Sequence, residues 1–183
     1  MTYYHGNASA ASDRLGGDLA RLCSTAKKDT LLSLAKSLGV AVPAMERGYA
    51  HNEYTPEQIG WRRGTGEMLV FDLRTTGLGT RFADVAPWLG VPDQVLQAGY
   101  ARSELADHYL EQYLSAGGPS VSKEDLMRET RLLWQHSHLD GLNWWHEHAL
   151  MGIESSEDAD KGRSMCRQRL EEELKHLLET LPQ

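Results

Sequence analysis

Residues 51–58 read His51-Asn52-Glu53-Tyr54-Thr55-Pro56-Glu57-Gln58, and Asp72 follows Gln58 by fourteen residues. A carboxylate near a hydroxyl can accept its proton, while an amide oxygen and a second carboxylate can hold Mg²⁺ against a phosphoryl group. Glu53, Gln58 and Asp72 therefore suit divalent-metal and phosphate chemistry. A purely structural role stays open on spacing alone, because Asp72 could cap the next turn and His51 could be a core histidine with satisfied hydrogen bonds.

The segment between Gln58 and Asp72 has the pattern of a β-hairpin. Ile59–Arg62 and Glu67–Phe71 are short, rich in β-forming residues and partly apolar. Arg63-Gly64-Thr65-Gly66 between them supplies the permissive backbone that a tight turn needs. We therefore predict a hairpin over residues 58–71 with its turn at 64–66.

The rest of the chain favours helix. Leucines near helical spacing from Ser12 to Leu38 predict two helices or one bent helix, with a break at residues 27–29 where Asp29 caps the second segment, and Gly39 as the stop. Further helices are expected over Phe82–Leu89, Gln94–Gly99, Ser103–Ser115, Ser122–Ile153 and Ser156–Leu181, with Ser103 and Ser122 as N-caps. The predicted fold class is mainly α with a short β-hairpin.

Composition narrows the class of protein. The chain has 183 residues, of which 40% are hydrophobic and 25% charged, which suits one ordinary domain. No apolar run approaches the roughly 20 residues of a membrane span, and the N-terminus has no secretory pattern, so we expect a cytoplasmic protein without a membrane segment. Nineteen basic against 26 acidic residues give a net charge of −7, the wrong sign for binding nucleic acid. Cys23 and Cys166 are interpreted as ordinary thiols.

Residues 51–72 resemble the catalytic loop of the aminoglycoside phosphotransferase and choline kinase-like family, which shares the protein-kinase-like fold. That loop reads His-Gly-Asp, four further residues and Asn, with a proline just before its end. Here His51 matches the His, Glu53 stands at the catalytic Asp, Pro56 matches the proline and Gln58 stands at the Asn. The family then has a short hairpin that leads to a metal-binding Asp, and Asp72 falls at that place.

The resemblance continues beyond the hairpin. Gly77-Leu78-Gly79 and Asp84-Val85-Ala86 are similar to the family's Gly-Ile-Gly and Asp-Leu-Ala. In the family the second Asp braces the catalytic loop from the start of a helix, which implies that role for Asp84. The match covers residues 51–86, and it implies the helical C-terminal lobe of the kinase-like fold.

By this resemblance the chain is a phosphotransferase lobe with ATP and Mg²⁺ as cofactors. It implies Glu53 as the catalytic base, Gln58 and Asp72 as metal ligands, and His51 and Asp84 as supports of the loop. Glu replaces Asp at position 53 and Gln replaces Asn at position 58, and each replacement adds one methylene. A displacement of about one ångström can cost on the order of a hundredfold in rate.

Kinase-like enzymes also need an N-terminal lobe with a phosphate-covering loop and a lysine. Only 50 residues precede His51, most of them with helical patterns, and no Gly-x-Gly-x-x-Gly occurs there. We therefore expect residues 1–183 to form a single C-terminal lobe, with a catalytic-loop-like region at 51–86 and a helical substrate region at 87–183, the N-terminal lobe being absent. On its own, this polypeptide is expected not to turn over ATP.

Two functions follow from this expectation. The first is ATP-dependent phosphoryl transfer to the hydroxyl of a small-molecule acceptor, once an N-terminal lobe is supplied by a longer protein or by a protein partner. The second is a pseudoenzyme, a non-catalytic kinase-like module that binds a small molecule or a protein partner and needs no cofactor.

A second group of polar residues lies near the C-terminus: His136, His138, Asp140, His146, Glu147 and His148. Such residues can bind zinc, but the pattern of two histidines four apart around a Glu is absent, which disfavours a metal site. In the resembled family the later helices form the acceptor pocket, so Asp140, Trp144 and Glu147 are candidates for substrate contact. Core tryptophans beside surface charge are the alternative. The leucine stripe of residues 170–181 is expected to dock on the same lobe, with a partner helix as the lesser alternative.

Overall fold

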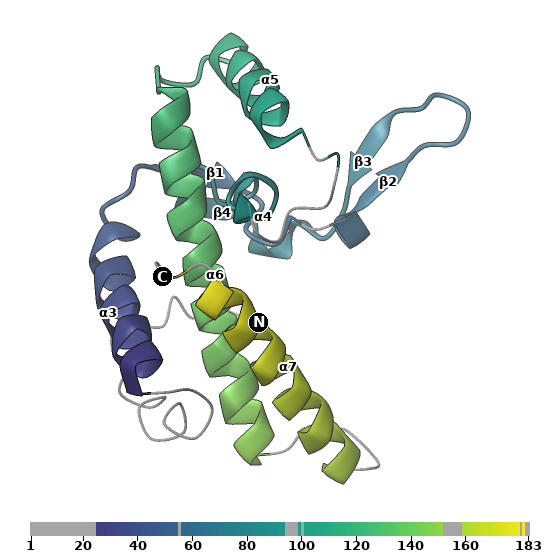
Figure 1. The fold of residues 1–183 in the computed structure, drawn as a ribbon. Helices are drawn as coiled ribbons and strands as arrows, with labels where there is room; N and C mark the ends of the chain where they lie inside the picture. The colour runs from purple at the N-terminus through teal and green to yellow at the C-terminus, as the bar shows by residue number, and fades with distance from the viewer. Residues whose placement is uncertain are drawn as a thin grey trace. The chain divides into compact units, whose positions relative to one another are not determined.

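The computed structural model describes residues 25–54, 56–93, 99, 101–151, 159–179 and 181. The elements in chain order are α3 (Thr25–Ala41), β1 (Arg47–Ala50), the 3₁₀ turn η1 (Pro56–Gln58), β2 (Ile59–Trp61), β3 (Met68–Val70), the 3₁₀ turn η2 (Leu73–Thr75), β4 (Gly77–Thr80), α4 (Ala86–Leu89), α5 (Arg102–Ser115), α6 (Lys123–Met151) and α7 (Ala159–Glu179) (Figure 1). The fold is mainly helical with two small antiparallel sheets, which confirms the predicted helical class.

The chain divides into two compact units. The first holds all four strands, α4, α5 and α6 up to Leu133, and the second holds α3, α6 from Trp134 onward, and α7. The candidate residues of the 51–86 region therefore belong to the first unit.

The predicted hairpin is confirmed. β2 and β3 pair antiparallel with Ile59 opposite Val70 and Trp61 opposite Met68. Gly64 and Gly66 have φ of 91° and 69°, a backbone conformation that glycine adopts without steric cost, and Gly66 N donates to the carbonyl of Arg62 at 3.1 Å. The permissive turn sequence thus sets the register that leads into Asp72.

A second sheet was not predicted. β1 pairs antiparallel with β4, from Arg47 opposite Thr80 to Ala50 opposite Gly77. Its strands are short and contain glycine, which weakens any local strand pattern, and they lie far apart in the sequence. Position 48 has little room for a larger residue, because a Cβ on Gly48 would lie 3.2 Å from the Cα of Arg81.

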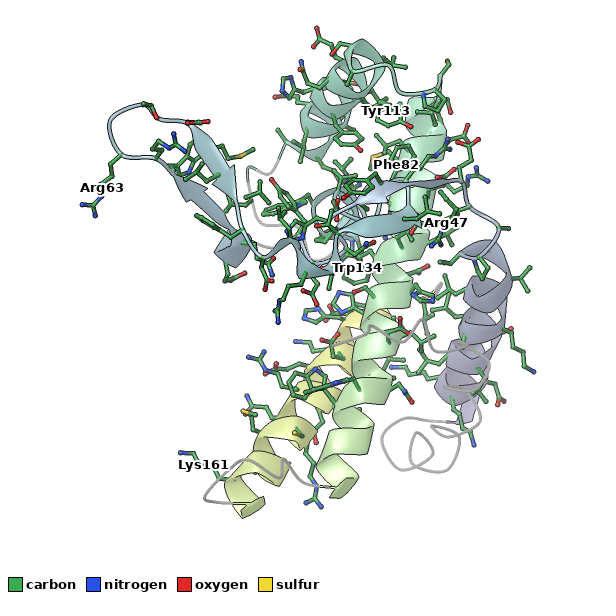
Figure 2. The ribbon with its side chains drawn as sticks, turned by 180° about the vertical axis from the view of Figure 1, so that it is seen from behind. Arg47, Arg63, Phe82, Tyr113, Trp134 and Lys161 are labelled. Carbon is green, nitrogen blue, oxygen red and sulfur yellow. The ribbon has the colours of Figure 1, made fainter. Side chains whose placement is uncertain are left out.

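The core of the first unit forms around Phe82. This side chain is buried, and its ring makes edge contacts with Tyr109 and Tyr113 of α5, with ring centroids 6.1 and 5.6 Å away (Figure 2). Arg81 beside it donates to the Glu129 carboxylate of α6 at 3.1 and 2.7 Å and also pairs with Glu46. These contacts fix the segment that leads from β4 to Asp84.

Several helix boundaries differ from the prediction. No break occurs at residues 27–29, because α3 runs unbroken from Thr25 to Ala41 with Lys27 and Asp29 exposed, and Gly39 lies inside it. Only Ala86–Leu89 of the expected Phe82–Leu89 helix is helical, and residues 81–85 form turns. The earlier part of the 12–38 prediction and most of the 94–99 helix lie outside the described residues.

Of the two N-caps predicted after residue 100, the structure confirms Ser122 and contradicts Ser103. Ser122 accepts a bond from Asp125 N at 3.0 Å, which confirms it as the cap of α6. Ser103 is not the cap of α5, which begins at Arg102 after Ala101. The Ser103 hydroxyl instead accepts a hydrogen bond from Lys123 Nζ at 2.8 Å.

In the second unit the predicted leucine stripe is buried. Leu170, Leu174 and Leu177 of α7 are buried, as are Leu31 and Leu38 of α3, the helix that α7 contacts. Burial of this stripe within the chain fits docking on the same lobe better than a free partner surface. None of the helices in the described ranges is both long enough and apolar enough to cross a bilayer.

Candidate functional site

The loop after β1 is held by the carboxylate of Asp84. His51 N donates to Oδ2 of Asp84 at 2.7 Å, and Asn52 N donates to Oδ1 at 2.9 Å. Bonds to an ionised acceptor are about twice as strong as neutral ones, so this pair fixes the backbone that presents Glu53. The structure shows the contact that the resemblance implies for Asp84, and the catalytic function of the loop stays a prediction.

Asn52 contributes a second clamp. Its φ is 66°, in the left-handed region that Asn tolerates better than most residues, and it stands where the resembled motif has Gly. Its Nδ2 donates to the carbonyl of Thr75 at 2.8 Å and to that of Ala50 at 3.3 Å. The sequence interpretation missed Asn52, although its place at a motif glycine was a readable indication of this backbone.

His51 links the loop to the end of the hairpin. Its ring is buried, and Nε2 lies 2.8 Å from the carbonyl of Phe71, so Nε2 carries a proton and donates to that carbonyl. Nδ1 is buried with no hydrogen-bond partner in the described structure. Thr75 Oγ1 donates to the carbonyl of His51 at 2.9 Å. These bonds tie the loop to the residues on both sides of Asp72.

Asp72 stands at the turn between β3 and η2. Its φ of 55° and ψ of 58° are left-handed, a conformation that Asp, like Asn, adopts more readily than most other non-glycine residues. Arg74 donates to Oδ1 through Nε at 2.5 Å and to Oδ2 through Nη2 at 2.7 Å. These hydrogen bonds, with the nearby charges of Arg74 and His51, lower the pKa of Asp72. Sequence reasoning missed Arg74.

Gln58 and Glu53 lie in the same region of the first unit. The carbonyl of Gln58 accepts a hydrogen bond from Phe71 N at 2.8 Å, which places Gln58 beside the strand end that leads to Asp72. The hydrogen bond and charge of Asp72, and then the charge of Glu53, raise the pKa of Arg74. Glu53 is therefore within electrostatic reach of the Arg74–Asp72 pair.

The side-chain oxygens of Asp72 and Gln58 suit a hard divalent cation, but the pairing of Asp72 with Arg74 opposes its binding. Carboxylate and amide oxygens of Asp72 and Gln58 are the ligands that Mg²⁺ prefers. Both oxygens of Asp72 are bonded to Arg74, however, so a cation would meet the guanidinium first. Among the described residues no three His, Cys, Asp or Glu side chains form a metal-binding group. Water or phosphate oxygens would have to complete the coordination.

The acceptor candidates belong to the second unit. On α6, Oδ2 of Asp140 lies 3.2 Å from Nδ1 of His136, and burial raises the pKa of Asp140 to about 7. Trp144 is partly exposed and makes an edge contact with Trp145. The side chain of Glu147 lies outside the described residues.

The histidines for which the sequence pattern disfavours a zinc site make other contacts. His136 faces Asp140, and His138 pairs with Glu173 of α7. The side chains of His146 and His148 are outside the described part of the chain. The described histidines therefore form ion pairs or hydrogen bonds along α6 and to α7.

Comparisons with known proteins agree with a kinase-like fold and leave the family open. No protein-family model matches the chain, and no curated protein matches it. A solved structure, an ethanolamine kinase of Plasmodium vivax, is similar with a TM-score of 0.51 and 16% sequence identity. The similarity covers 96% of this chain and 48% of the kinase, so this chain spans about half the length of that protein. At this identity the likeness concerns the fold, and by fold the chain is distantly kinase-like.

Proposed function

We propose that the chain is the C-terminal lobe of a small-molecule kinase similar to the aminoglycoside phosphotransferase and choline kinase-like enzymes. It would transfer a phosphoryl group from ATP to a hydroxyl when an N-terminal lobe is supplied by a longer protein or by a partner. The observation that carries this proposal is the pair of hydrogen bonds from His51 and Asn52 to Asp84. Two backbone hydrogen bonds to one carboxylate preorganise the loop and the residue that follows it, Glu53.

Each polar residue of the first unit then has a proposed task. Glu53 accepts the proton of the acceptor hydroxyl as the oxygen attacks phosphorus. Gln58 and Asp72 would hold Mg²⁺, which supplies positive charge to the phosphate oxygens when it is bound. His51 and Asp84 position the loop and touch neither substrate.

The proposed acceptor is a small amino alcohol. The structurally similar protein is an ethanolamine kinase, and carboxylates and indole faces are groups that bind an ammonium. We propose Asp140, Trp144 and Glu147 for this contact.

The proposed N-terminal lobe would find an apolar surface on the first unit. Seven large apolar side chains of the strands and the turn after β3 are exposed in the described structure: Tyr49, Trp61, Met68, Val70, Phe71, Leu73 and Leu78. Exposed large apolar side chains, where they form a patch, are typical of a surface that another protein segment covers. This surface supports a partner lobe on the strand-bearing unit.

The test is an ADP-release assay on the longest natural polypeptide that contains this chain, with ethanolamine, choline and an aminoglycoside as acceptors. We expect acceptor-dependent ADP release that falls at least about a hundredfold in Glu53→Ala, because the base is lost. Glu67→Ala is the matched control, since Glu67 pairs with Arg62 at the hairpin and should leave the rate unchanged. Equal rates in both variants, or no release with any acceptor, would contradict the proposal.

The second candidate function is the non-catalytic module, and the Arg74–Asp72 pair favours it because an internal cation already neutralises Asp72. The discriminating measurement is calorimetry of ATP with and without Mg²⁺ on the same polypeptide. Mg²⁺-dependent binding that Asp72→Asn abolishes supports the kinase, and Mg²⁺-independent or absent binding supports the module.

A further inference from the structure

The carboxylate of Asp72 forms an ion pair with the guanidinium of Arg74. The Arg74 guanidinium presents two N–H groups to the two oxygens of Asp72, at 2.5 and 2.7 Å. This parallel arrangement is the fork geometry in which arginine binds carboxylates most specifically. Lysine or a distant arginine would not reproduce it.

The backbone builds this pair locally. Asp72 is left-handed and lies directly before η2 as its N-cap, and Thr76 N closes that turn with a 3.1 Å bond to the carbonyl of Leu73. The turn brings residue 74 back beside residue 72. The pair therefore depends on the same unusual backbone that presents Asp72 to the site.

The exposure of the Arg74 side chain indicates that the Arg74–Asp72 pair contributes little to the stability of the fold. The side chain of Arg74 is 76% exposed, whereas that of Arg81, which holds β4 to α6, is 12% exposed. Exposed ion pairs contribute little to folding, so Arg74 can leave Asp72 without loss of the fold. The charge of Glu53 is also among the causes that raise the pKa of Arg74, after the hydrogen bond and charge of Asp72, so Glu53 and the guanidinium interact electrostatically.

We propose that Arg74 is an internal counter-ion of the candidate metal site, and that a divalent cation binds Asp72 only when the guanidinium moves away. This inference rests on the proposed role of Asp72 as a metal ligand. Arg74 and the cation compete for the same two oxygens, and their like charges repel at short range. Displaced from Asp72, the exposed guanidinium is free to bind a phosphate of the incoming ligand.

The test measures Mn²⁺ binding to the 183-residue chain from the electron paramagnetic resonance of the free ion. We expect Arg74→Met to raise the affinity about tenfold, because one positive charge a few ångströms from a dication is removed. Arg74→Lys should lie between Arg74→Met and the wild type, since lysine keeps the charge but loses the fork. Adding Asp72→Asn to Arg74→Met should return the affinity to the wild-type value or below.

The matched control is Arg63→Met, which makes the same change of net charge at the exposed turn of the hairpin (Figure 2). It should alter the affinity by less than about twofold, because the charge is screened from the site. An Arg74→Met affinity within twofold of the wild type would overturn the inference. If both proteins then bind Mn²⁺ tightly, the proposed kinase role survives, and if neither binds it, that role falls as well.

Discussion

The side chain of Asn52 lies so close to the backbone of Gly79 that the two positions are coupled. A Cβ atom on residue 79 would overlap Oδ1 of Asn52 and lie 3.3 Å from its Cγ. The glycine of β4 therefore leaves room for the side chain that clamps the loop to Thr75.

This coupling predicts a non-additive double variant. Gly79→Ala should lower the free energy of unfolding by about 1–3 kcal/mol, since the added methyl group overlaps Asn52. In an Asn52→Gly background only the Cβ of Ala50, 3.3 Å away, still crowds the new methyl group, and the same change should cost at least about 1 kcal/mol less. Urea unfolding of the four proteins measures this. Gly77→Ala in the same strand is the control, because its Cβ would meet only the Thr75 carbonyl at 4.0 Å. Additive costs would show that Asn52 and Gly79 do not constrain each other.

Removing the charge of Asp84 should loosen the loop. Asp84→Asn keeps one acceptor and turns an N–H group toward a backbone N–H, so we expect a loss of about 2–3 kcal/mol in unfolding free energy. Asp107→Asn is the control: this exposed aspartate pairs with Lys123, and its loss should cost less than about 1 kcal/mol. Equal costs in chemical denaturation would mean that the loop is held by other contacts.

The stability of the second unit should depend on Asp140 and pH. Burial raises the pKa of Asp140 from 3.8 to about 7, so the folded state holds this proton more tightly than the unfolded state. The stabilisation is complete below about pH 4 and is lost as the pH rises to 7.

The expected size of this effect is modest. The full shift would correspond to about 4 kcal/mol, but the side chain is 35% exposed and lies 3.2 Å from His136, so we expect about 1–2 kcal/mol. Asp140→Asn should flatten the unfolding free energy between pH 5 and 8, and Glu111→Gln, an exposed change on α5, should not. A wild-type protein whose stability rises over this range would contradict the assignment.

The 183-residue polypeptide by itself should not turn over ATP. The phosphate-covering loop and the lysine of kinase-like enzymes come from the N-terminal lobe, and without them the triphosphate is left in water. Calorimetry should find weak or undetectable Mg²⁺-ATP binding. Micromolar binding that depends on Mg²⁺ and disappears in Asp72→Asn would refute this, and Glu53 would then be the next residue to test.

The sequence alone predicted those features that a few consecutive residues specify. The hairpin turn at Gly64 and Gly66 and the cap at Ser122 are contained in a few consecutive residues, and both predictions are confirmed. The contact of Asp84 with the 51–52 backbone spans more than thirty residues and was reached only through the family resemblance.

Other features depend on backbone geometry that no local pattern specifies. β1 and β4 pair although the whole candidate site lies between them in the sequence, and their glycines give no strand pattern. The Arg74–Asp72 pair needs a left-handed residue at position 72, since residues two apart do not otherwise face each other on a regular helix. The expected break in α3 was wrong because charged residues sit on the exposed face of a continuous helix.

The pairing of Ala50 with Gly77 makes residues 51–76 a closed loop whose two ends meet at one small sheet. Separating these ends opens the whole loop, and closing it again costs chain entropy. In hydrogen-exchange terms, the amides of His51 and Asn52 should become labelled at the same rate as those of β1 and β4 that bond across the sheet, as one cooperative unit. Whatever chemistry the loop performs, its lifetime in the folded state depends on these four residue pairs as well as on the hydrogen bonds to Asp84.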